Sequence, residues 1–388
     1  MESNKTSGNI DLMIACVLVF FPLTSSIGKL IPFSINQVLV LLLVLLIILK
    51  VLINGKIQIP SMFVILFMIF FAFNGLVLST ELSLNIENCI YWATTILLLT
   101  YIWKEKNRVA LYEAFQSCQK QILLSTILVI VINFVGLLYG TNYELTGAYK
   151  GFMVTSHSMA STMILSIANL TLYKKNSFHV VSVTLLILFL FASQARTFML
   201  PLAVILYFEL RQWITHKTKR RAVIAIMAAV VIMIFPYTSM ADKFMETINN
   251  PYARDWLSGL TNFRSTLWKG DIDRFAAENW YLKLFGNGFS YTYQLHENLY
   301  GVKIWSHNDF FNLLLATGVI GLIGYIYMLL NTILTLHRGH RDCFFSFLFT
   351  LMIFGTAFFN GFYLYIAVVF AFEVLAAGRC VTVGGCTR

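Results

Sequence analysis

Charged side chains are scarce in this sequence. Only 12% of its 388 residues are Asp, Glu, Lys or Arg, whereas 58% are hydrophobic and the mean hydropathy is +0.75. A soluble domain carries about 25% charged residues, so the composition excludes an ordinary soluble protein. The apolar runs are continuous rather than alternating, which indicates membrane-spanning helices and argues against a β-barrel.

Metal-binding and disulfide patterns are also missing. The six cysteines are scattered, and the Cys380/Cys386 pair is too weak a signal for zinc. The sequence has no His-Glu-x-x-His motif and no carboxylate pair of glycosidase or metal-binding character. We therefore predict a site that uses no metal and no cofactor.

The apolar runs predict an all-α, polytopic integral membrane protein with about twelve transmembrane helices. A large polar loop separates the ninth and tenth helices. The predicted organisation is helices 1–9 in residues 1–237, a periplasmic loop with short helices in 238–306, and helices 10–12 with a short cytoplasmic tail in 307–388. The expected spans are 10–27, 34–53, 60–79, 84–103, 121–140, 152–173, 178–194, 196–213, 221–237, 308–336, 343–359 and 361–377.

The positions of Lys and Arg predict the orientation of these spans. If the N-terminus is cytoplasmic, the cytoplasmic segments and adjoining span ends hold 18 of the 28 basic residues, whereas the short outer loops hold three. Cytoplasmic loops are enriched in basic residues, so we expect both termini in the cytoplasm. The basic run from Lys217 to Arg221 is then a topology signal rather than a nucleic-acid site.

The loop 238–306 carries seven basic and seven acidic residues. Thr261 or Asn262 is suited to cap a helix from about Phe263 to Glu278. The sequence Gly286-Asn287-Gly288 indicates a turn and not a phosphate-binding loop, because no strand precedes it and no Lys-Ser/Thr follows.

His307 and Asn308 stand at the mouth of a long apolar run. A histidine at a membrane interface can exchange protons near neutral pH and bind a substrate. The alternative is an ordinary interface histidine that begins a helix. Gly318, Gly321 and Gly324 follow, and we expect these glycines to permit close helix packing.

Two arginines on the predicted outer side are candidates for binding an anion. Arg196 lies between two apolar runs with almost no loop, where an arginine is energetically costly, and Arg264 begins the predicted loop helix, where a cation opposes the helix dipole. The alternatives are a snorkelling arginine at Arg196 and a surface ion pair at Arg264. Lys150 and His157 are weaker candidates, because Lys150 is better explained as a plain loop lysine and His157 is explained equally well as a structural histidine.

Guanidinium groups bind phosphate oxygens bidentately and keep their charge at physiological pH. The anion expected at the outer face of a bacterial-type bilayer is a lipid diphosphate. Arginines would neutralise a diphosphate leaving group without a metal, while His307 would take a proton from an attacking hydroxyl.

These motifs resemble a known family. His307-Asn308, followed after nine residues by Gly318-x-x-Gly321-x-x-Gly324, is similar to the signature of the superfamily of O-antigen ligases and Wzy-type O-antigen polymerases. Further matching features are the Ala195-Arg196-Thr197 turn, the Arg264-x-x-x-Trp268 helix and Leu284-Phe285-Gly286-x-Gly288. The resemblance covers about residues 140–360 as an ordered set.

The resemblance implies a bacterial inner-membrane glycosyltransferase that faces the periplasm. It implies a catalytic His307 and diphosphate-binding Arg196 and Arg264. We further predict that Lys150, His157 and Asn308 contact the substrate. The expected partners are an oligosaccharide linked to undecaprenyl diphosphate, membrane lipids and a chain-length regulator protein, with no nucleic acid. We predict a polymerase of repeat units. The alternatives are a ligase that transfers the glycan to lipid A-core and a flippase that transports the repeat unit.

Overall fold

The computed structural model describes most of the chain. The described residues are 2–31, 35–54, 81–142, 147–234, 261, 263–338 and 343–384, together with 69, 236, 241 and 245. Their regular structure is helical, apart from one isolated antiparallel bridge between Asn142 and Tyr149, so the all-α class is confirmed. Nearly all of the expected span 60–79 and nearly all of 238–262 lie outside the described residues.

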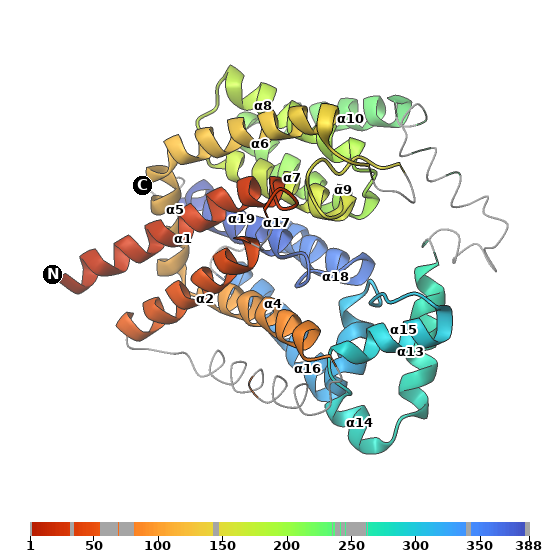
Figure 1. The fold of residues 1–388 in the computed structure, drawn as a ribbon. Coiled ribbons are helices and arrows are strands. Elements are labelled where there is room, and N and C mark those ends of the chain that lie inside the picture. Colours follow the sequence, from red (N-terminus) through yellow and green to blue (C-terminus); the bar gives the residue numbers. More distant parts are fainter. Residues whose placement is uncertain are drawn as a thin grey trace. The chain divides into compact units, whose positions relative to one another are not determined.

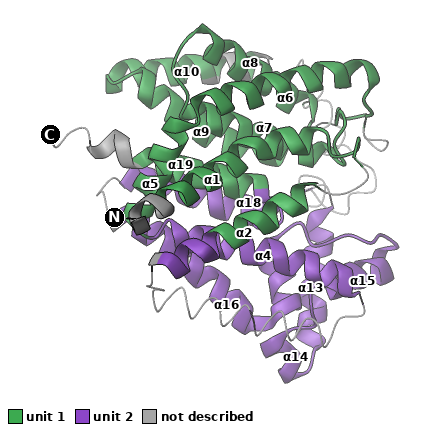
Figure 2. Cartoon of the chain, turned by 60° about the vertical axis from the view of Figure 1, so that its left-hand side comes forward, with its two compact units in different colours: residues 1–46, 104–246, 367–388 green, residues 47–103, 247–366 purple. Residues whose placement is uncertain are grey.

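The chain divides into two compact units, each built from separate stretches of sequence. Unit 1 comprises residues 1–46, 104–246 and 367–388, and unit 2 comprises residues 47–103 and 247–366 (Figure 2). Helix α2 (Ile35–Asn54) contributes residues to both units.

Unit 1 is a bundle arranged around α7 (Figure 1). Its helices are α1 (Glu2–Ser26), α5 (Glu105–Ser117), α6 (Gln119–Tyr139), α7 (Ser156–Thr171), α8 (Ser177–Ala192), the 3₁₀ turn η1 (Arg196–Phe198), α9 (Met199–Trp213), α10 (Lys217–Ile234) and α19 (Ile366–Gly384).

Helix α7 is buried along almost its whole length and packs against α1, α6, α8 and α9. Its sequence mixes small and apolar residues, which lets neighbouring helices approach closely. Thr155 caps its N-terminus, because the Thr155 hydroxyl accepts a hydrogen bond from the Ser158 N–H at 3.0 Å. Near its C-terminus, Asn169 donates to the carbonyl of Leu18 in α1 at 3.2 Å. This bond fixes α7 against the first helix.

Unit 2 contains the long segment that follows His307 and the helices of the preceding loop. Its helices are α4 (Leu82–Tyr101), α13 (Arg264–Ala277), α14 (Trp280–Phe285), α15 (Ser290–Tyr300), α16 (Asp309–Arg338), α17 (Cys343–Thr350), the π-helical turn η3 (Leu351–Gly355) and α18 (Thr356–Phe359). The helix expected from Phe263 to Glu278 is thus confirmed as α13. Thr261 helps to hold its first turn, since its hydroxyl accepts from the Ser265 N–H at 3.1 Å.

Helix α16 is interrupted at Gly318, whose φ of 68° and ψ of −172° are not helical. The Tyr325 hydroxyl donates to Asp309 Oδ2 at 2.8 Å, although residues sixteen apart on a straight helix are separated by about 24 Å along its axis. The chain must therefore bend sharply between them. Our expectation of one continuous helix over 308–336 is wrong: a short helix, 309–317, packs against a longer one, 319–338, whose length of about 30 Å matches a bilayer core.

The segment after α14 fills the break in α16. The N–H groups of Asn287 and Gly288 donate to the carbonyls of Leu315 and Ala316, each at 2.9 Å. The helical partners of these two carbonyls would lie beyond the break, so the segment replaces the lost bonds. A Cβ atom added at Gly318 would collide with the backbone of Leu284, which confirms that this glycine permits close packing.

Five helices of the described residues are long and apolar enough to cross a membrane, namely Gly8–Ser26, Ile35–Ile53, Leu82–Tyr101, Gln119–Tyr139 and Asp309–His337. Shorter apolar helices cover Ser177–Ala192 and Cys343–Phe359. The protein is therefore of the multi-pass membrane type, while the total of twelve spans remains a prediction. Helix α5 was not expected from the sequence.

The contact between Gly318 and Leu284 predicts a large effect of Gly318→Ala on stability. The backbone of Gly318, with φ 68° and ψ −172°, lies in a region that is essentially restricted to glycine and costs other residues about 1–3 kcal/mol, and a collision with the Leu284 backbone is added. Gly301→Ala is the matched control, because Gly301 also has a positive φ of 71° but has no atom within 4 Å of an added Cβ. We expect Gly318→Ala to lower the melting temperature of the purified protein clearly more than Gly301→Ala. Equal decreases would contradict the tight packing at the break.

Candidate functional site

The six residues singled out in the sequence fall into two groups of three. Lys150, His157 and Arg196 belong to unit 1, and Arg264, His307 and Asn308 belong to unit 2. In unit 1, Arg196 lies some forty residues after Lys150 and His157, and in unit 2, Arg264 lies some forty residues before the adjacent His307 and Asn308. The two groups are described in turn.

His307 lies directly before α16 in a strained backbone conformation. Its φ is 50°, one of three positive values at non-glycine residues in the described part of the chain. Such values are uncommon outside glycine, although histidine tolerates them better than most residues, and they cluster at functional sites. The imidazole is half-buried and its ring centroid lies 4.9 Å from that of Trp305. The indole therefore restricts the orientation of the imidazole.

Helix α13 lies beside His307 and is attached by two side chains one turn apart. The Trp268 indole N–H donates to the carbonyl of Ser306, the residue before His307, at 2.8 Å. The Arg264 guanidinium donates to the carbonyl of Phe359 at the end of α18. Because Arg264 and Trp268 share one face of the helix, these bonds bring Arg264 to the same region as His307.

Asp309 is a buried polar residue of this region that the sequence analysis did not single out. It is fully buried, and its Oδ2 atom accepts hydrogen bonds from the Phe362 N–H at 2.6 Å and the Tyr363 N–H at 3.4 Å, besides that from Tyr325. A buried carboxylate is costly unless several donors surround it. Asp309 thereby ties the first turn of α16 to the segment after α18. The sequence feature that could have identified Asp309 is its position directly after the His307-Asn308 pair.

A chain of polar side chains continues from Asp309 into the unit. Asn312 Nδ2 donates to the Tyr363 hydroxyl at 2.8 Å, and that hydroxyl contacts Asn88 Oδ1 in α4 at 3.4 Å. Trp92 packs between Tyr325 and Tyr363, with ring centroids at 5.1 and 5.4 Å. The N-terminus of α16 is thus held in place by a buried hydrogen-bond network and not by apolar contacts alone.

Asn308 caps α16. Its Oδ1 atom accepts from the N–H groups of Phe310 at 2.9 Å and Phe311 at 3.2 Å. Its Nδ2 atom is buried and has no hydrogen-bond partner among the described residues. Asn308 therefore has a structural role at the start of α16, and its side-chain amide N–H group is enclosed by the protein.

In unit 1 the three predicted residues meet at the turn between α8 and α9. Arg196 follows Gln194, whose φ of 55° reverses the chain, and it begins η1. The ring of His157 packs against Phe198 with centroids 6.0 Å apart. The Tyr149 N–H donates to the carbonyl of Ala192 at 3.1 Å. This bond attaches the loop that contains Lys150, the residue after Tyr149, to the same turn.

Lys150 has only 6% of its surface exposed, so it is not the solvated loop lysine that the sequence suggested as the simpler explanation. Arg196 is also partly buried. Basic groups removed from water in this way interact strongly with an anion, because the surrounding dielectric constant is low. The turn is therefore chemically suited to bind a phosphate or diphosphate.

A second histidine, His296, connects the helices of the loop. It is fully buried, with Nε2 2.8 Å from Asp271 Oδ1 in α13 and Nδ1 2.8 Å from the carbonyl of Ile304. These contacts attach α15 and the segment leading to His307 to α13. His296 was not singled out in the sequence, since its role depends on a partner 25 residues away.

Comparison with known proteins agrees with the predicted superfamily. Residues 181–326 match the family model Wzy_C, described as O-Antigen ligase. This range contains Arg196, Arg264, His307 and Asn308 but neither Lys150 nor His157. The match supports the superfamily of O-antigen ligases and polymerases, whose members are glycosyltransferase-like enzymes that act on lipid-linked glycans. A search of curated proteins finds no match.

Proposed function

We propose that this chain, whose central region matches the O-antigen ligase domain, polymerises oligosaccharide repeat units carried on undecaprenyl diphosphate. The site would face the periplasm of a bacterial inner membrane, with both chain termini in the cytoplasm. The repeat units would be those of O-antigen or of a related surface polysaccharide, and a chain-length regulator protein would be a further partner. The chemistry of such a transfer is the displacement of a diphosphate by a sugar hydroxyl.

The observation that carries the proposal is the attachment of α13 beside His307. The two hydrogen bonds from Trp268 and Arg264 bring a base and a guanidinium to one region. A guanidinium has five N–H donors, so a guanidinium oriented by a bond to a carbonyl is also suited to bind an anion. The arrangement supports a site that removes a proton at one end and neutralises an anion at the other.

The proposed reaction is a direct transfer. The imidazole of His307 accepts the proton of the acceptor hydroxyl, and the oxygen forms a bond to the anomeric carbon of the donor sugar. The bond from that carbon to the diphosphate oxygen breaks, and its electron pair leaves with undecaprenyl diphosphate. Arg264 stabilises the developing negative charge without a metal, and Arg196 is the second arginine that the sequence predicts for this role. The proton then leaves His307 to water or to the departing diphosphate.

A ligase is the second candidate, because the matched family model carries that description. A ligase would use the same donor and base but pass the glycan to lipid A-core. The glycan phenotype of a deletion strain separates the two functions. Lipid A-core with a single repeat unit indicates a lost polymerase, whereas bare core with accumulated lipid-linked polymer indicates a lost ligase.

The role of His307 is tested by its substitution. Positioned general bases contribute about 10²–10⁴-fold to rate, so His307→Ala and His307→Gln should both lose transfer activity by a factor in this range. Gln keeps the size and hydrogen bonding of the side chain but cannot accept a proton. The assay uses purified protein, a lipid-linked repeat unit and a chelator. Activity of His307→Gln within a few-fold of wild type would exclude the general base.

The arginines are tested by charge-conserving variants. Lysine keeps the charge but cannot bind a diphosphate bidentately, and loss of a charge-assisted hydrogen bond removes about 1.5–3 kcal/mol, or about 10- to 150-fold. We expect Arg196→Lys and Arg264→Lys each to lower kcat/KM by such a factor. Arg220→Lys is the control, because Arg220 donates to the carbonyl of Ile214 on the predicted cytoplasmic side. Full activity of both test variants would assign them structural roles.

The orientation is tested by thiol labelling. Asp273 is exposed on α13, so Asp273→Cys should react with a membrane-impermeant maleimide in intact spheroplasts. The parent protein is the control, since its exposed Cys343 is predicted to face the cytoplasm and should react only after permeabilisation. Labelling in the reverse order would invert the proposed topology.

A further inference from the structure

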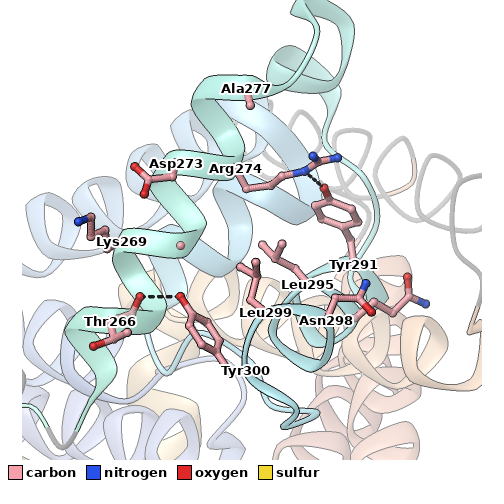
Figure 3. Close-up of a pocket in the computed structure, with 12 residues that line it drawn as sticks. Thr266, Lys269, Asp273, Arg274, Ala277, Tyr291, Leu295, Asn298, Leu299 and Tyr300 are labelled. Atoms are coloured by element: carbon pink, nitrogen blue, oxygen red, sulfur yellow. Dashed lines mark hydrogen bonds between the residues drawn. The ribbon is translucent and has the colours of Figure 1, made fainter. Parts of the chain in front are cut away.

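A groove lies between α13 and α15, on the loop that precedes His307 (Figure 3). Its volume is about 710 Å³, which is in the range of sites that bind small ligands. The lining residues of α13 extend from Thr266 to Ala277, and those of α15 from Tyr291 to Tyr300. The groove therefore follows α13 for about 16 Å. The reaction proposed above does not use it.

A tyrosine is fixed at each end of the groove. At one end the Tyr300 hydroxyl donates to the Thr266 carbonyl at 3.0 Å, and the neighbouring Gly270 leaves room for that hydroxyl, since a Cβ would collide with it. At the other end the Tyr291 hydroxyl donates to Glu278 Oε1 at 2.7 Å and accepts from the Arg274 guanidinium. Both rings are thus held in place before a ligand binds.

The walls between the tyrosines combine apolar surface with an amide. The side chains of Leu295 and Leu299 lie between Tyr291 and Tyr300, and Asn298 lies on the same helix (Figure 3). Asn298 is exposed, and its amide offers both hydrogen-bond donors and an acceptor. Aromatic rings and leucines accept the apolar C–H face of a ligand, while the amide pairs with its polar edge.

The charges of the groove are largely balanced. The Arg274 guanidinium forms an ion pair with Glu278 at 2.9 Å, and burial raises the pKa of Tyr291, so this phenol stays neutral. Lys269 and Asp273 carry opposite charges, and Figure 3 shows both pointing away from α15. The interior of the groove therefore favours an uncharged ligand over a phosphate or an acidic peptide.

We propose that this groove binds an uncharged segment of oligosaccharide. A sugar ring presents an apolar C–H face and a rim of hydroxyl groups, which matches the tyrosine, leucine and amide surfaces described above. The inference rests on the proposed function for its source of ligand, because α13 also carries Arg264 at its N-terminus. A glycan whose diphosphate lies at Arg264 would extend along this helix into the groove. The groove would thus hold the part of the saccharide that lies away from the reacting bond.

The test measures binding separately from catalysis. The probe is the soluble glycan released by mild acid from the lipid-linked saccharides of the producing cell, titrated calorimetrically into the purified full-length protein. Removing one hydrogen bond to a neutral ligand weakens binding by about 2- to 10-fold, and we expect this for Asn298→Ala. Asn298→Trp, which fills the groove with an indole, should abolish binding. Glu297→Gln, an exposed neighbour that does not line the groove, should bind as wild type does.

The outcomes separate this proposal from the proposed function. If transfer depends on His307 but the glycan affinity is the same in wild type and in both Asn298 variants, the groove is not a saccharide site. The same holds if the wild-type protein binds no glycan. If the Asn298 variants lose glycan binding while the His307 variants keep transfer activity, the groove is a saccharide site but the proposed catalytic mechanism is wrong. The assignment to the groove would also be overturned if Glu297→Gln reduced glycan binding as much as the Asn298 variants do.

Discussion

The hydrogen bond between Tyr325 and Asp309 determines the form of the site. It joins two residues that a straight helix would keep far apart, so it requires the chain to bend at Gly318 and the short helix 309–317 to lie against the longer one. The bend leaves backbone carbonyls without helical partners, which is costly in a membrane protein. The segment after α14 supplies the missing N–H groups. The break at Gly318, the burial of Asp309 and the packing of the segment after α14 therefore depend on one another.

This arrangement explains how a membrane protein holds a polar site at the end of an apolar run. The Oδ2 atom of Asp309 accepts from a tyrosine hydroxyl and two backbone N–H groups, so the burial of this oxygen is compensated. The residues before it are then fixed: Asn308 caps the short helix, and His307 takes up a positive φ. Strain at His307 is tolerated because the network around Asp309 holds the flanking backbone.

The loop helices add a second level of organisation. Helix α13 carries Arg264 at its start and Trp268 one turn later, and both side chains bond to backbone beside the site. The groove follows most of the length of α13, and the buried Asp271 of this helix contacts His296 of α15. A single helix thus connects a candidate diphosphate-binding arginine to a candidate saccharide groove. In unit 1, the segments that carry Lys150 and His157 pack against the turn at Arg196. These three residues form the second group of candidate site residues.

The sequence by itself determined the helical class, the approximate ends of most helices and the start of α13, because apolar runs and capping residues act over a few neighbouring positions. It also selected His307, Asn308 and the arginines, whose cost at a membrane interface is visible without a structure. Only the tertiary structure decided the break at Gly318, the burial of Lys150 and the role of Asp309. These features depend on contacts such as those of Asp309 with Tyr325 and Phe362, 16 and 53 residues away, and no local pattern encodes partners at such separations.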